Sequence, residues 1–223
     1  MLLPRPRVRR LVQLHLGLLL YGATMALLVR SGLGLDPWDV FHEGVADRTG
    51  LTFGTVVILT GAVVLLAWWP LRQRPGIGTV ANVVVIGLAA DATLWLLPDP
   101  GHLTWQIVYL VGGIVGNGLA GGLYIGAGLG PGPRDGLMTG LVRVTGRSVR
   151  LVRTSLEVTV LLVGWAVGGT VGVGTVAYAL LIGPSVQLSL RWFTIPSSHA
   201  SASSKPAEPV HDSTRVGRPS ALG

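Results

Sequence analysis

Two carboxylate residues stand inside long apolar runs, where a charged side chain is costly unless it has a partner or a function. Asp91 lies in the run 78–97 and has no cation near it in the sequence. It is therefore the first candidate for a functional carboxylate that binds a proton or a cation, although a structural role fits the pattern about as well. Glu157 lies in the run 149–167, one helical turn after Arg153, so it can either pair with this arginine or line a substrate path.

A motif that occurs twice contains two further candidates. Residues 32–50 return at 128–146, an offset of 96 positions, with eight of the nineteen residues identical. Asp39 returns as Asp135, each in the first turn of a predicted short helix. The simpler interpretation is that such a carboxylate complements the helix dipole and caps free N–H groups. Alternatively, the two helix starts face each other near the middle of a membrane and line a substrate path.

The residue order predicts where this short helix begins and ends. Asp36 is a typical N-cap residue, Pro37 suits the first helical position, and Gly50 ends the helix. About eleven residues remain, or roughly 16 Å, which is too short to cross a bilayer. We expect one such helix in each copy, either lying in the membrane interface or entering the membrane as a re-entrant element.

The duplication extends beyond the motif. Residues 76–79 return at 172–175 with the same offset, so a unit at 11–97 is followed by a second copy at 107–193. The repeated glycines let helices start close to their neighbours, and they do not form a P-loop because its lysine is missing. The repeated positions are Gly32, Gly34, Pro37, Gly76 and Gly78 in the first copy and Gly128, Gly130, Pro133, Gly172 and Gly174 in the second.

Amide side chains inside the apolar runs add two candidates for a substrate or ion path. Gln187 aligns with Asp91 across the duplication, and Asn117 aligns with Tyr21. Amides in membrane helices also join neighbouring helices by hydrogen bonds, so a purely structural role is open for both.

The composition is that of a membrane protein. Hydrophobic residues make up 49% of the 223 residues, charged residues only 12%, and the mean hydropathy is +0.60. Soluble domains carry about 25% charged residues. The absence of cysteine excludes disulfides and thiolate chemistry. The net charge of +7 does not indicate nucleic-acid binding here, because the cations stand between apolar runs.

Six runs approach the ~20 residues that cross a hydrocarbon core. The sequence therefore predicts an all-α membrane protein with six transmembrane helices, arranged as two repeats of three. Five spans is the alternative, because the run 149–167 contains charged residues. The expected spans are 11–29, 51–69, 78–97, 105–125, 149–167 and 171–190.

The distribution of charge predicts how these spans are oriented. With the N-terminus in the cytoplasm, fifteen of the 17 Lys and Arg residues fall on the cytoplasmic side. The basic segment 1–10 and the tail 194–223 are then cytoplasmic, and the polar composition of the tail predicts disorder. Because each repeat has an odd number of spans, the second enters the membrane from the opposite side. The repeats are expected to be inverted, as in many secondary transporters.

The motifs of enzymes are missing from the sequence. It contains no HExxH or GxSxG motif and no cluster with the spacing of metal ligands. We therefore expect neither an enzyme nor a bound metal or cofactor.

Three segments resemble those of the YczE/YyaS/YitT-type bacterial integral membrane proteins: 32–39, 74–79 and 128–135. The resemblance covers about 11–193 and leaves the tail outside. It implies a small multi-span protein of the bacterial inner membrane. It implies no catalytic or binding residues.

Two functions are compatible with these features. The first is a small secondary transporter or exporter, expected to form a homodimer, whose substrate or ion path involves Asp39, Asp91 and Asp135. The second is a non-transporting scaffold or accessory factor, whose basic loop and tail contact another protein or anionic lipid. Both have the lipid bilayer as a partner, and neither requires nucleic acid.

Overall fold

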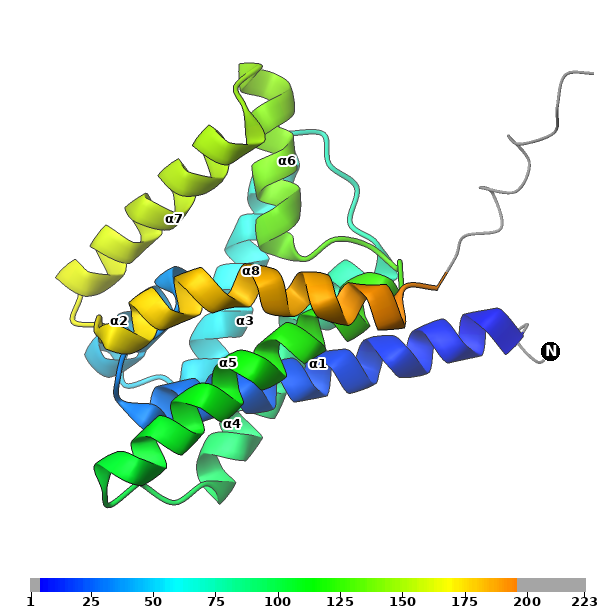
Figure 1. Cartoon of the computed structure of the whole chain (residues 1–223). Helices are drawn as coiled ribbons and strands as arrows, with labels where there is room; N and C mark the ends of the chain where they lie inside the picture. The colour runs from blue at the N-terminus through cyan, green and yellow to red at the C-terminus, as the bar shows by residue number, and fades with distance from the viewer. Residues whose placement is uncertain (1–4, 196–223) are drawn as a thin grey trace, which may run out of the picture.

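The computed structural model describes residues 5–195, and over these residues it is entirely helical (Figure 1). The second four helices repeat the first four at the offset of the sequence duplication. The predicted tail, apart from Thr194 and Ile195, lies outside the described residues. The helices are α1 (Arg5–Ser31), α2 (Pro37–Thr49), α3 (Phe53–Trp68), α4 (Ile77–Leu96), α5 (Leu103–Gly126), α6 (Pro133–Thr145), α7 (Val149–Ala166) and α8 (Val173–Phe193).

Four helices are long and apolar enough to cross a membrane: α1, α4, α5 and α8. A fifth span is present if α2 and α3, which meet at an angle of 116°, form one bent crossing. These lengths confirm the predicted all-α membrane protein. The prediction of six spans is not established by them, because α3 has only 16 residues and α7 contains Arg150, Arg153 and Glu157.

The two short helices begin and end as the sequence predicts. The Asp36 side chain accepts hydrogen bonds from the backbone N–H groups of Trp38 and Asp39, at 2.8 and 3.1 Å, and so caps α2. Gly50 ends α2 in the left-handed conformation, with φ of 70°. Helix α6 has the same length and ends at Gly146 in the same way, but its N-cap is a glycine without a side-chain cap.

The turns that lead into these helices join the two halves of the chain. The backbone N–H of Gly174, at the start of α8, donates to the Leu33 carbonyl at 2.8 Å. The equivalent N–H of Gly78, at the start of α4, donates to the Leu129 carbonyl at 2.9 Å. A Cβ atom at Gly78 would lie 2.9 Å from that carbonyl oxygen, so the repeated glycine allows this close approach. Each half therefore holds the other through the same contact.

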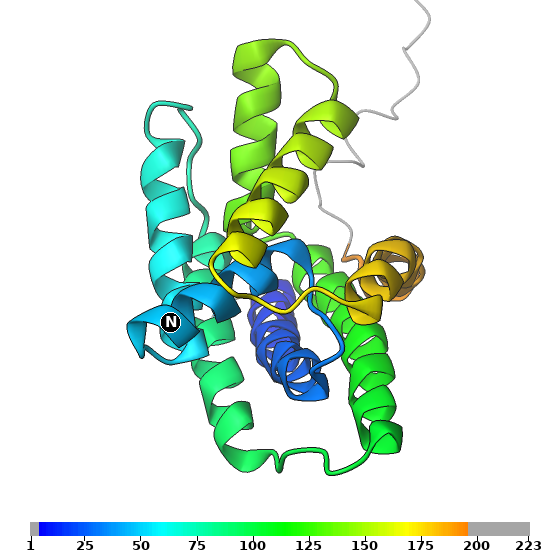
Figure 2. The ribbon, with the colours of Figure 1, turned by 90° about the vertical axis from the view of Figure 1, so that its left-hand side faces the viewer.

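The centre of the fold is α1, which packs against both α4 and α5 (Figure 2). Glycines bring these helices into close contact. A Cβ atom at Gly17 would lie 2.7 Å from the backbone nitrogen of Tyr124, and one at Gly22 would overlap the Ile86 carbonyl of α4. Leu14, Leu18 and Met25 of α1 are buried in this core. Close backbone approach at small residues is the usual way in which membrane helices gain packing energy.

The two halves differ where α7 meets α8. Helix α3 packs along α4, whereas α7 diverges from α8 after the loop that joins them (Figures 1 and 2). In the first half Gly54 and Gly61 of α3 lie directly against α4. The equivalent residues of α7 are Arg150 and Glu157, whose long charged side chains prevent the same contact. Gly183 of α8 consequently faces open space, since a Cβ atom added to it would meet no neighbouring helix within 4 Å.

We expect Gly22→Val to destabilise the protein, because the added side chain would overlap the backbone of α4. Overpacking of this kind costs about 1–3 kcal/mol. Thermal unfolding of the purified protein in detergent measures the effect. Gly112→Val is the matched control, because Gly112 is exposed in the middle of α5 and its nearest neighbour atom would be 3.9 Å away. Equal melting temperatures for the two variants would contradict the packing of α1 on α4.

Candidate functional site

The first part of the site is the start of α2, where two carboxylates are buried. Asp36 and Asp39 expose 2% and 0% of their surface. The residue order fixes their positions: Asp36 caps the helix, and Asp39 follows one turn later on the same side. His42 lies a further turn along, and its Nδ1 is 3.1 Å from an Asp39 carboxylate oxygen. The ring of His42 is 2% exposed and packs against Phe53.

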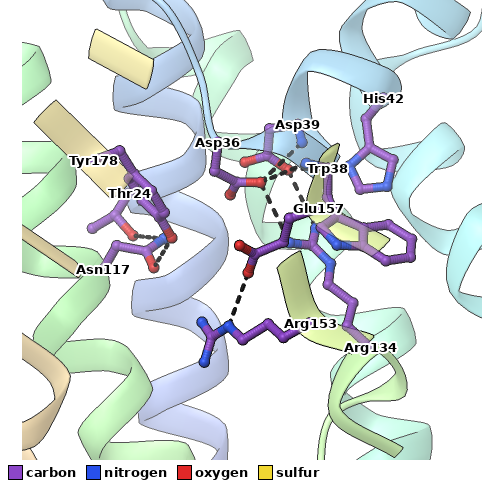
Figure 3. Close-up of polar contacts among 10 residues, drawn as sticks. All are labelled: Thr24, Asp36, Trp38, Asp39, His42, Asn117, Arg134, Arg153, Glu157 and Tyr178. Atoms are coloured by element: carbon purple, nitrogen blue, oxygen red, sulfur yellow. Dashed lines mark hydrogen bonds and ion pairs between the residues drawn. The ribbon is translucent and has the colours of Figure 1, made fainter. Parts of the chain in front are cut away.

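Arg134, at the start of α6, supplies the cation that faces these carboxylates. Its guanidinium nitrogens lie 3.5 Å from an Asp36 oxygen and 3.4 Å from an Asp39 oxygen (Figure 3). The guanidinium also lies over the ring of Trp38, 5.0 Å from the ring centre, in a cation–π contact. Residues 38 and 134 are equivalent positions of the duplication. The starts of the two short helices therefore meet at this cluster.

The carboxylates have more hydrogen-bonding capacity than this cluster uses. One oxygen of each, Asp36 Oδ2 and Asp39 Oδ2, is buried and has no hydrogen-bond partner within the described part of the chain. A buried acceptor without a partner is unfavourable, so these oxygens are the part of the site where a donor is missing.

A second polar group joins three membrane helices beside this cluster. Asn117 of α5 donates from Nδ2 to Thr24 of α1 at 3.3 Å, and the Tyr178 hydroxyl of α8 donates to Asn117 Oδ1 at 3.1 Å (Figure 3). Thr24 and Asn117 are almost completely buried. These hydrogen bonds show Asn117 as a link between helices, and they also place it at the wall of the cavity described next.

Between these groups lies a cavity of about 430 Å³. It extends from the starts of α2 and α6 into the space between α7 and α8, so the divergence of these two helices opens it. Arg153 and Glu157 form an ion pair of 3.0 Å on its α7 side. The polar residues of its wall are Tyr21, Asp36, Trp38, His42, Thr60, Asn82, Asn117, Arg134, Asp135, Arg153, Glu157, Tyr178 and Gln187.

Five of the six predicted site residues lie at this cavity or directly beside it. Asp135, Glu157, Asn117 and Gln187 line it, and Asp39 lies behind Asp36 in the ion cluster. Asp135 accepts a hydrogen bond from the Tyr124 hydroxyl at 3.3 Å. The expected pairing of Glu157 with Arg153 is confirmed.

Asp91, the first candidate, is not among the residues that line the cavity. Its carboxylate accepts hydrogen bonds from the Thr52 hydroxyl at 2.5 Å and from the backbone N–H of Gly54 at 2.6 Å. It therefore binds the start of α3 to α4. This explains why no cation lies near Asp91 in the sequence. Its carboxylate is paired with neutral donors at the start of another helix and not with a cation.

Sequence reasoning missed the central cation. The charge pattern places Arg134 among the basic residues of a cytoplasmic loop, but its side chain is only 31% exposed and pairs with buried carboxylates. The same reasoning gives Asp36 only the role of capping α2, and it also pairs with Arg134. The duplication contained a signal that Arg134 belongs to the site. Arg134 is the equivalent of Trp38, and both lie in the segment in which the two copies are most similar.

The comparisons with known proteins identify a family whose function is unknown. The Family of unknown function (DUF6198) matches residues 8–191. The chain is 42% identical over 164 residues to an uncharacterized protein of Haemophilus influenzae, covering 74% of this chain and 75% of that protein. It is 34% identical to the uncharacterized membrane protein YczE of Bacillus subtilis, covering 87% of this chain and 94% of that protein. The uncharacterized protein YyaS of Bacillus subtilis is 24% identical, covering 75% and 86%.

These matches show that the chain belongs to the Family of unknown function (DUF6198). They confirm the resemblance to YczE-type membrane proteins. No solved structure matches the chain.

We expect Arg134→Ala to destabilise the fold, because it leaves Asp36 and Asp39 buried without a cation. Breaking a buried pair costs about 3–5 kcal/mol, and the partial exposure of Arg134 places the effect at the lower end. Thermal unfolding in detergent is the measurement, and Arg147→Ala, which removes an exposed arginine, is the control. Combining Arg134→Gln with Asp36→Asn and Asp39→Asn should restore part of the stability. Additive losses in the combined variant would contradict the ion cluster.

Proposed function

We propose that this member of a family of unknown function is a small secondary transporter of the bacterial inner membrane. The observation that carries the proposal is the cavity of about 430 Å³ at which the starts of α2 and α6 meet across a buried ion cluster. Its volume is in the range of ligand sites. In a protein whose surroundings are apolar, buried charges beside a cavity are a typical sign of a substrate or ion path.

The architecture we propose is six spans in two inverted repeats. The matched helix bounds and the exchanged contacts of Gly78 and Gly174 support a two-fold relation between the halves. Two equivalent residues, Trp38 and Arg134, touch each other, as residues on such an axis must. Transporters of this design bind substrate at the repeat interface, near short helices that do not cross the membrane.

The different packing of the two halves supports alternating access. The α3–α4 side is closed by direct helix contact, and the α7–α8 side is open to the cavity. A transporter needs two such arrangements, one open to each side of the membrane. We propose that the described arrangement is one of them, and that a homodimer gives this slender six-helix unit additional support in the lipid bilayer.

A labelling experiment tests the inverted topology. The chain has no cysteine, so single cysteines are unambiguous reporters. Thr49→Cys and Thr145→Cys place them at equivalent, exposed positions at the ends of α2 and α6. In intact cells a membrane-impermeant thiol reagent should label the first and not the second, and both should react after permeabilisation. Equal labelling of both in intact cells would contradict the inverted repeats.

A second labelling experiment tests transport more directly. Ile182→Cys places the thiol in the α8 wall of the cavity. In right-side-out and inside-out vesicles, an impermeant reagent should reach this cysteine from both sides, because a transporter exposes its site to each side in turn. Thr49→Cys is the control that should react from one side only. Labelling of Ile182→Cys from a single side would contradict alternating access and favour a non-transporting scaffold.

A further inference from the structure

We propose that the cavity binds a monovalent organic cation that carries N–H donors on an apolar body, such as an amine or a guanidinium compound. The inference rests on the proposed function, because it names the class of substrate that the transport site would accept.

The site carries more negative than positive groups. Four carboxylates, those of Asp36, Asp39, Asp135 and Glu157, lie at the cavity or directly behind it. They face only two guanidinium groups, those of the arginines at 134 and 153. Even with His42 counted among the bases, the acidic groups outnumber the basic groups by one. Uncompensated charge is costly inside a membrane protein, so the excess favours a cationic ligand.

The unused acceptors have the chemistry that such a ligand needs. The buried Oδ2 atoms of Asp36 and Asp39 have no hydrogen-bond partner in the part of the chain that the structure describes. Asp36 belongs to the cavity wall, and a small rotation of its side chain would bring the buried Oδ2 to a ligand in the cavity. An N–H donor with a positive charge would satisfy this acceptor and reduce the excess negative charge at the same time.

The protein's own arginine shows that a guanidinium fits against these carboxylates and Trp38. Arg134 lies between two carboxylates and the face of Trp38, at distances of 3.5, 3.4 and 5.0 Å (Figure 3). Carboxylates together with an aromatic face are the general environment for binding organic cations. The tethered guanidinium of the second half is therefore a chemical stand-in for the substrate we propose.

The remaining wall favours an organic cation over an inorganic one. Apolar side chains of α1, α3, α4 and α8 complete the cavity, among them Met25, Val64, Ile86 and Val186. A bare ion would fill little of about 430 Å³. In the described residues, His, Asp and Glu side chains form no group of three that could hold a metal ion.

The N-termini of α2 and α6 would favour an anion in the cavity. However, each of these helix starts already has a carboxylate of its own. The Asp36 side chain caps α2. At α6 no side chain caps the helix, but Asp135 is an acidic residue in its first turn. An anionic ligand would therefore meet two acids where it needs donors.

The experiment compares probes that have nearly the same shape and different charge. Benzylguanidinium is positive, benzylurea is neutral and 3-phenylpropionate is negative. Binding to the full chain in lipid nanodiscs is measured by calorimetry, and uptake of the same radiolabelled probes is measured in proteoliposomes. We expect benzylguanidinium to bind at least about tenfold more tightly than benzylurea, the ratio for one charge-assisted hydrogen bond, and 3-phenylpropionate not to bind.

Variants test the sign of the effect. Asp36→Asn, which keeps a helix-capping residue, should weaken binding of benzylguanidinium about tenfold, whereas Arg134→Gln should strengthen it. Because Arg134→Gln destabilises the fold, Glu157→Gln is the second test; this side chain is 42% exposed, and its loss of charge should weaken binding. Asp47→Asn is the charge-matched control, because Asp47 is exposed on α2 outside the cavity wall.

The outcomes separate this inference from the proposed function. Tight binding and uptake of benzylguanidinium support both. Preference for benzylurea or 3-phenylpropionate, with uptake of that probe, overturns the cation class and leaves the transporter standing. Binding of benzylguanidinium without uptake supports the cation site and contradicts transport. If no probe binds to the folded protein, or if Asp47→Asn weakens binding as much as Asp36→Asn, the cation site is wrong.

Discussion

The contact between Arg134 and the carboxylates of Asp36 and Asp39 determines how the two halves of this protein fit together. The three residues come from two short helices that are far apart in the sequence, and none of their charges is acceptable in an apolar interior without the others. The pairing therefore fixes the start of α2 against the start of α6. The positions of Trp38, His42 and Asp135 follow from it, because each belongs to one of these helix starts.

The cavity depends on this pairing of the two halves and on a difference in sequence between α3 and α7. The exchanged backbone contacts hold the starts of α4 and α8 in equivalent places. The helices that precede them, α3 and α7, can then close against their neighbours only if their facing residues are small. Glycine at 54 and 61 satisfies this condition, and the charged residues at 150 and 157 do not. One side of the protein is consequently packed and the other is open to the cavity.

The sequence was sufficient for the helices and for four of the polar residues that line the cavity, because both depend on local patterns. Capping residues and glycines predicted α2 and α6 closely, and the duplication predicted that the chain has two equivalent halves. The partners of the charged groups could not be predicted, because they are set by contacts across the fold. Asp91 lacked a cation in the sequence but has two neutral donors in space, whereas Arg134 stood in a loop-like basic segment and is paired inside the site.

The two-fold relation that we propose between the duplicated halves would also explain why the copies differ where they meet. Equivalent residues on such an axis face each other, so an identical charge in both copies would face itself and be repelled. At positions 38 and 134 the chain has Trp opposite Arg, which attract each other. At the equivalent positions 36 and 132 it has Asp in one copy and Gly in the other, so only one copy supplies an anion there. The backbone of the two short helices is therefore the same in both copies, whereas the side chains that meet between them differ and attract each other.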